Sequence, residues 1–137
     1  MKALGIDHGD KRIGIAVSDD LGMLAHPLEF ILTEPYEAFL ERLKTIMVER
    51  QIEQIVVGMP RNMDGSYGPQ ALKVQNFLAT LKKSVAVPVQ SWDERLTSIS
   101  AVKNLREAGV NAKKAKEKVD ASAAAVMLQA YLDSLSG

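Results

Sequence analysis

Acidic side chains stand at three places in this sequence where folding could bring carboxylates together. Asp7 ends an apolar run at the N-terminus, and the pair Asp93 and Glu94 ends a second apolar segment. Asp120 precedes apolar residues at helical spacing, which predicts that it lies on the core-facing side of a helix. A charge is costly to bury without a ligand, so we expect these acids to face one common site.

Carboxylates that meet without histidine or cysteine suit Mg²⁺ or Mn²⁺, because these hard cations prefer oxygen ligands. A pair of such ions can activate a water and stabilise the leaving oxygen in phosphodiester hydrolysis. The chain has no cysteine, which excludes thiolate catalysis and cysteine-ligated zinc, and its two histidines argue against a histidine-rich metal site. Adjacent strand residues point to opposite faces, so only one of Asp93 and Glu94 should face the metal ions.

Each acid also has a simpler interpretation. Asp7 could form a turn at a strand end, Asp93 and Glu94 could be helix-entry charges favoured by the helix dipole, and Asp120 could cap a helix. Basic residues near these acids could bind phosphate groups or form a solvated face. They are Lys11, Arg12, Arg61, Arg95, Lys113, Lys114, Lys116 and Lys118.

Length and composition narrow the class of protein. The 137 residues fit one compact domain, residues 1–137, with an ordinary globular composition. Seventeen basic and seventeen acidic residues give no net charge, so any nucleic acid must be bound by a local basic patch. No signal peptide or membrane span is expected, and we predict a soluble cytoplasmic protein.

Apolar periodicity predicts an α/β protein with a mixed five-stranded sheet and helices on both faces. Residues 4–6 and 13–17 resemble a β-hairpin, and Pro27 marks the beginning of a third strand at a sheet edge. The further expected elements are a helix at 36–50, a strand at 54–58, a loop at 59–69, a helix from 69, a strand at 86–92, a helix between 97 and 109, and a helix at 119–135. Residues 111–118 could be a loop or a helical extension.

Four blocks of the sequence, taken together, resemble the YqgF family, also called RuvX. The blocks are DHGDKRIGIAVSD at 7–19, VGMPRNMDGSYGP at 57–69, DERLT at 93–97 and VDASAAAVMLQAYL at 119–132. The resemblance implies an RNase H-like fold with strand order 3-2-1-4-5, related to RuvC-type Holliday junction resolvases. It also implies a nuclease that matures the 5′ end of the small-subunit ribosomal RNA precursor, pre-16S rRNA.

The resemblance assigns Asp7, Glu94 and Asp120 as catalytic metal ligands for Mg²⁺ or Mn²⁺, with Asp93 as the alternative to Glu94. Among the motif positions, Lys11, Arg12, Asn62 and Arg95 would meet phosphate. The chain departs from the family pattern at Asp10, where threonine or glutamate is frequent, and at Arg61, where an apolar residue is common. Neither departure removes an expected acid.

The leading hypothesis is a metal-dependent endonuclease acting on structured RNA, as a monomer or homodimer. Cleavage of branched DNA, as by a Holliday junction resolvase, is the second possibility, and it would require a dimer to cut two strands symmetrically. A third is a ribosome-assembly factor that binds nucleic acid without cleaving it. An actin-like ATPase or sugar kinase would need two such domains to enclose ATP, and this chain has room for one.

Overall fold

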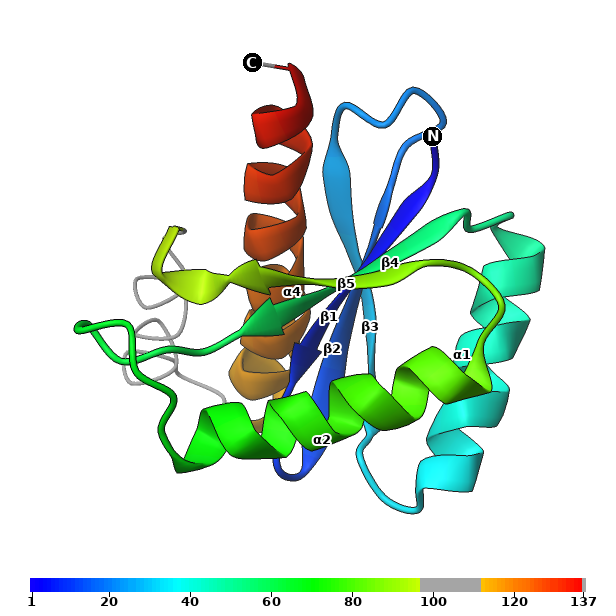
Figure 1. Ribbon diagram of the computed structural model, residues 1–137. Coiled ribbons are helices and arrows are strands. Elements are labelled where there is room, and N and C mark those ends of the chain that lie inside the picture. The colour runs from blue at the N-terminus through cyan, green and yellow to red at the C-terminus, as the bar shows by residue number, and fades with distance from the viewer. Residues whose placement is uncertain (97–111, 137) are drawn as a thin grey trace.

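The computed structural model describes residues 1–96 and 112–136, with side chains in the last helix described from 123 to 135. Figure 1 shows a central sheet with helices on both of its faces. The elements are β1 (Ala3–His8), β2 (Arg12–Ser18), β3 (Ala25–Leu32), α1 (Tyr36–Glu49), β4 (Gln54–Met59), α2 (Pro69–Ser84), β5 (Val89–Asp93), a 3-10 turn (Glu94–Leu96) and α4 (Ala112–Ser136).

The sheet has five strands in the order β3-β2-β1-β4-β5, which confirms the predicted mixed topology. β1 and β2 pair antiparallel through the short hairpin, and β3 pairs antiparallel with β2. β4 reaches β1 through α1, and β5 reaches β4 through α2, so both of these pairs are parallel. The carboxyl ends of β1, β4 and β5 therefore lie at the same end of the sheet.

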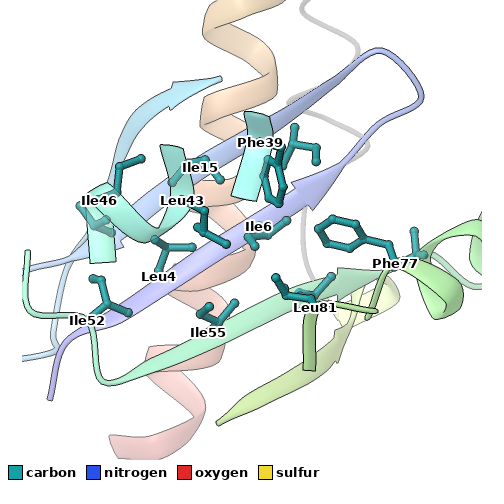
Figure 2. Close-up of a cluster of buried hydrophobic side chains, with 14 of the residues drawn as sticks. Leu4, Ile6, Ile15, Phe39, Leu43, Ile46, Ile52, Ile55, Phe77 and Leu81 are labelled. Atoms are coloured by element: carbon teal, nitrogen blue, oxygen red, sulfur yellow. The ribbon is translucent and has the colours of Figure 1, made fainter. Parts of the chain in front are cut away.

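One face of the sheet carries most of the hydrophobic core. Large aliphatic residues alternate along β1, β2 and β4, and the apolar stripes of α1 and α2 cover them. Figure 2 shows this layer, in which Ile6 of β1 lies between Phe39 of α1 and Leu81 of α2, with Leu4 farther along the strand. These four side chains are completely or almost completely buried.

The opposite face is covered by α4 and carries smaller strand residues. Ala3, Ala16 and Val56 pack against the helix, whose contacting residues include Ala124 and Leu128. A Cβ atom added at Gly5 would lie only 3.0 Å from the Cβ of Leu128, so the helix packs almost directly on the backbone of β1. Among the described residues, no helix is both long and apolar enough to cross a bilayer.

Two predicted strand boundaries were wrong, and proline explains both. β3 begins at Ala25, and Pro27 lies inside this edge strand. The pairing of β3 with β2 is irregular next to Pro27, where a proline without an N–H can be accommodated. β5 begins at Val89 rather than Ala86, because Pro88 can accept a hydrogen bond from Ile55 but has no N–H to donate.

The C-terminal helix includes the segment for which the sequence left a loop and a helical extension open. α4 begins at Ala112, so residues 112–118 are a helical extension rather than a loop. The predicted helix between 97 and 109 lies outside the described residues.

Candidate active site

Asp7 lies near the carboxyl end of β1, as predicted, and is 7% exposed. Its partner on β2 is Gly14. Because side chains alternate along a strand, Asp7 shares a face with Gly5, which lies directly beneath α4. The carboxylate therefore lies on the α4 face of the sheet rather than in the aliphatic layer under α1 and α2.

Glu94 lies on this same face. Trp92, which precedes it by two residues, packs into the α4 layer and pairs with Gly58 of β4. The Oε1 atom of Glu94 lies 2.7 Å from the position that a Cβ of Gly58 would occupy. Val57 of β4 pairs with Ile6 of β1 in a parallel register, so the next residues along the two strands, Gly58 and Asp7, are also neighbours. Gly58 thus leaves space for the Glu94 carboxylate next to the strand that carries Asp7.

Asp93 has a different environment, in which two arginines bind its carboxylate. Arg95 donates from Nη2 to Oδ2 at 2.7 Å, and Arg61 donates from Nη1 to the same oxygen at 3.4 Å. The hydrogen bonds from Arg95, with the charges of Arg95 and Arg61, hold the pKa of Asp93 below its ordinary value despite the opposing effect of burial. The alternation between neighbours thus assigns Glu94 to the face of Asp7 and Asp93 to the arginines.

The segment between β4 and α2 is a loop, as predicted, and Arg61 organises it. Its guanidinium donates to the carbonyl oxygen of Gly65 and lies 4.6 Å from the centre of the Tyr67 ring. The side chain of Asn62 donates to Ser66 Oγ at 3.0 Å. Two of the predicted phosphate-binding residues, Arg61 and Asn62, therefore hold the loop itself.

The backbone of α4 brings residue 120 toward the end of the sheet where β1, β4 and β5 terminate. Tyr131 donates to Gln54 at the start of β4, while Ala124 lies over Gly5, so α4 runs antiparallel to β1 and β4. Residue 120 precedes Ala124 by four residues, about 6 Å along a helix, and Asp7 follows Gly5 by about 7 Å along a strand. Residue 120 of the helix backbone is therefore level with Asp7.

The side chains of Asp120, Lys113 and Lys114 lie outside the described residues. Within the described part of the chain, no three histidine, cysteine, aspartate or glutamate side chains form a group that could hold a metal ion. The described part of the predicted site is thus Asp7 of β1 and Glu94, which directly follows β5, on one face of the sheet.

The hairpin beside Asp7 carries the other predicted basic residues. Lys11 is exposed in the turn, and Arg12 begins β2 with its guanidinium 5.5 Å from the centre of the Phe30 ring. His8 points to the opposite face, where its ring lies 4.6 Å from Phe77 and burial lowers its pKa.

Two features of the site were not predicted from the sequence. The apolar run at 54–58 indicates only that Gly58 ends a buried strand, although a glycine there can signal a close approach by another group. The role of Asp93 as the partner of two arginines was also missed. Its signal was the arginine in the same Asp93-Glu94-Arg95 block, which had been assigned to phosphate alone.

Comparisons of the sequence find related proteins along nearly the whole chain. The family model described as "RuvX: Holliday junction resolvase" matches residues 1–134. A Halothermothrix orenii protein named "Putative pre-16S rRNA nuclease" is 47% identical over 133 residues, covering 97% of this chain and 95% of that protein. A protein of the same name from Desulforamulus reducens is 46% identical over 134 residues and covers 98% of both chains.

Comparisons of the structure support the predicted RNase H-like fold. T. thermophilus RuvC in complex with a Holliday junction substrate superposes with a TM-score of 0.59 and 18% identity, covering 100% of this chain and 96% of that chain. Fowlpox virus resolvase in complex with Holliday junction DNA superposes with a TM-score of 0.57 and 10% identity over 100% of both chains. With the family match along nearly its whole length and relatives at 46–47% identity, the chain belongs to the RuvX family.

Proposed function

We propose that this protein is an endonuclease that cleaves pre-16S rRNA near its 5′ end during ribosome biogenesis. The observation that carries the proposal is the match along 97% of the chain to a relative that is named a pre-16S rRNA nuclease. The grouping of Asp7 and Glu94 on one face supports it, because metal-dependent phosphodiester hydrolysis uses acidic side chains that meet at one point to hold the ions. Such a substrate implies action in the cytoplasm.

We propose Asp7, Glu94 and Asp120 as the residues that hold Mg²⁺ or Mn²⁺. The donor set fits such an ion because it consists of carboxylate oxygens alone, without histidine or cysteine. When bound, the ion would lower the pKa of a water nucleophile and neutralise charge on the phosphate. Asp7 lies near the end of β1 and Glu94 is the first residue of the 3-10 turn after β5, which limits the movement of their carboxylates.

Positive side chains would hold the RNA backbone around these acids. We assign this role to Lys11 and Arg12 of the hairpin and to Lys113 and Lys114 at the start of α4. The loop residues Arg61 and Asn62, with Arg95, would complete the surface. Because the chain has no net charge, binding should depend on this local patch and weaken as the salt concentration rises.

The test is cleavage of a pre-16S rRNA fragment that contains the 5′ processing site, in Mg²⁺ and separately in Mn²⁺. The wild type should cleave it, and Asp7→Asn should lower the rate by at least about 100-fold while the thermal midpoint stays near that of the wild type. Glu29→Gln is the matched control, because it also removes one negative charge, but from an ion pair with Arg42 of α1, on the face of the sheet opposite Asp7. Wild-type activity in Asp7→Asn would refute the proposal.

Cleavage of a four-way DNA junction is the second candidate function. The description of the matching family as a Holliday junction resolvase favours it. The same preparations should be incubated with a four-way junction, and their oligomeric state measured by light scattering, because symmetric cleavage of two strands requires a dimer. Cleavage of the junction by a dimer, without cleavage of the RNA, would favour this function. RNA cleavage by a monomer would favour the first.

A further inference from the structure

The carboxylate of Asp93 lies between two guanidinium groups at the end of β5. Arg95 binds both of its oxygens, with Nε 3.2 Å from Oδ1 and Nη2 2.7 Å from Oδ2. The backbone N–H of Arg95 also donates to Oδ1 at 2.9 Å. Arg61 approaches Oδ2 from the loop before α2 at 3.4 Å. The side chain of Asp93 is 18% exposed, so this pairing is partly shielded from water.

The two arginines also bind the backbone of that loop. Arg61 donates to the carbonyl oxygen of Gly65, and Arg95 donates from Nη1 to the carbonyl oxygen of Met63 at 3.5 Å. One carboxylate therefore joins the loop to the 3-10 turn whose first residue is Glu94. If Asp93 lost its charge, both arginines would lose a shared partner.

This geometry does not suit Asp93 to metal binding. Both of its oxygens already accept hydrogen bonds from cationic or backbone donors, and a metal ion there would lie against two positive guanidinium groups. The three groups together carry one net positive charge. Each guanidinium has five N–H donors, more than these contacts use, and arginine matches phosphate oxygens in pairs.

We propose that Asp93 is a positioning residue that holds Arg61 and Arg95 together as a paired guanidinium site for a phosphate of the RNA substrate, beside Glu94. The inference rests on the proposed function for the identity of the ligand. It assigns Asp93 to RNA binding and leaves catalysis to Glu94, although the two residues are adjacent. The proposed phosphate would bind at the same end of the sheet as the carboxylates, because Arg61 follows β4 by two residues and Glu94 and Arg95 directly follow β5.

The test compares Asp93→Asn, Glu94→Gln and the control Glu29→Gln with the wild type. The first measurement is native-state cleavage by trypsin after Arg61, followed by mass spectrometry, which does not depend on nuclease activity. A guanidinium released from Asp93 becomes available to trypsin, so Asp93→Asn should speed this cleavage about fivefold. Glu29→Gln should leave the cleavage after Arg61 unchanged, because its arginine partner lies on α1.

The second measurement is the Kd of each variant for the pre-16S rRNA fragment, together with KM and kcat for cleavage. Asp93→Asn should raise Kd and KM about tenfold and change kcat less than about twofold, whereas Glu94→Gln should lower kcat and leave Kd near the wild-type value. Unchanged RNA affinity in Asp93→Asn would overturn the proposal. So would a loss of kcat without a change in KM, because that result would make Asp93 catalytic.

Failure of the proposed function would be distinguishable from failure of this inference. If no preparation cleaves RNA, the nuclease proposal fails, but the trypsin rates and the RNA Kd values still decide whether Asp93 positions the arginines. Faster trypsin cleavage with a raised Kd supports the positioning role in that case. Wild-type values for either quantity refute it.

Discussion

Replacing Gly58 with alanine should impair catalysis without unfolding the protein. The new Cβ would lie 2.7 Å from Oε1 of Glu94, 3.3 Å from its Cγ and 3.4 Å from its Cδ. Ordinary van der Waals contact begins at 3.4 Å, so the carboxylate oxygen must move by about 3.4 − 2.7 = 0.7 Å. A glutamate side chain can make this movement by rotating its own bonds, and the sheet need not change.

The expected effects on stability and on rate differ for this reason. Alanine reduces the backbone entropy of the unfolded chain, so the free energy of unfolding should change by less than about 1 kcal/mol. A displacement of a catalytic group by about 1 Å can cost about 100-fold in rate. We therefore expect kcat to fall about 10- to 100-fold in Gly58→Ala, which corresponds to about 1.4 to 2.7 kcal/mol of activation free energy.

The assay is single-turnover cleavage of the pre-16S rRNA fragment, with denaturant unfolding as the measure of stability. A double-mutant cycle with Glu94→Gln tests whether the alanine acts through that side chain. In the Glu94→Gln background, Gly58→Ala should cause little further loss of rate, because the displaced carboxylate is already absent. Wild-type kcat in Gly58→Ala, or losses that multiply fully in the double mutant, would refute the role of Glu94.

Three further predictions concern stability and pH. Gly5→Ala should lower the free energy of unfolding by about 1–3 kcal/mol in a denaturant titration, because its Cβ would lie 3.3 Å from the backbone oxygen of Ala124 and force α4 to shift; an unchanged midpoint would contradict this packing. Tyr131→Phe should cost about 1–2 kcal/mol in the same measurement, since the buried oxygen of Gln54 loses a donor; stability equal to the wild type would show that the hydroxyl contributes nothing. The carboxyl of Asp19 accepts backbone N–H bonds that lower its pKa below 3.8, so ¹³C NMR should give a lower midpoint. Its stabilising effect should be complete above the unfolded pKa and disappear as the pH falls through the folded one; a midpoint at or above 3.8 would contradict these hydrogen bonds.

Most of the fold could be predicted from the sequence, because its strands and helices carry strong periodic signals. The continuous apolar run at 54–58 indicated a strand covered on both faces, and β4 is buried throughout. The boundaries failed at Pro27 and Pro88, where sequence periodicity continues but one backbone donor is missing. Periodicity reports which side chains are buried, whereas strand bounds depend on backbone hydrogen bonds.

The site was less predictable because its contacts join distant segments. Asp7 could be identified from its position at the end of a buried run, which is a local signal. The choice between Asp93 and Glu94 could not be made locally, because it depends on the register of β5 against β4 and on the space above Gly58. The ion pair between Arg61 and Asp93 spans 32 residues, and no spacing rule predicts such a contact.

The two faces of the sheet explain why Asp7 and Glu94 lie on the α4 face. On the face toward α1 and α2, large aliphatic side chains fill the space between the layers to the ends of the strands. On the α4 face, Gly5 and Ala16 let the helix approach the backbone, and this contact fixes the height of α4 above β1. Farther along the same face, Gly14 and Gly58 leave space beside Asp7. Small residues therefore first position the helix and then make room for carboxylates, and both effects come from one alternating pattern in the strands.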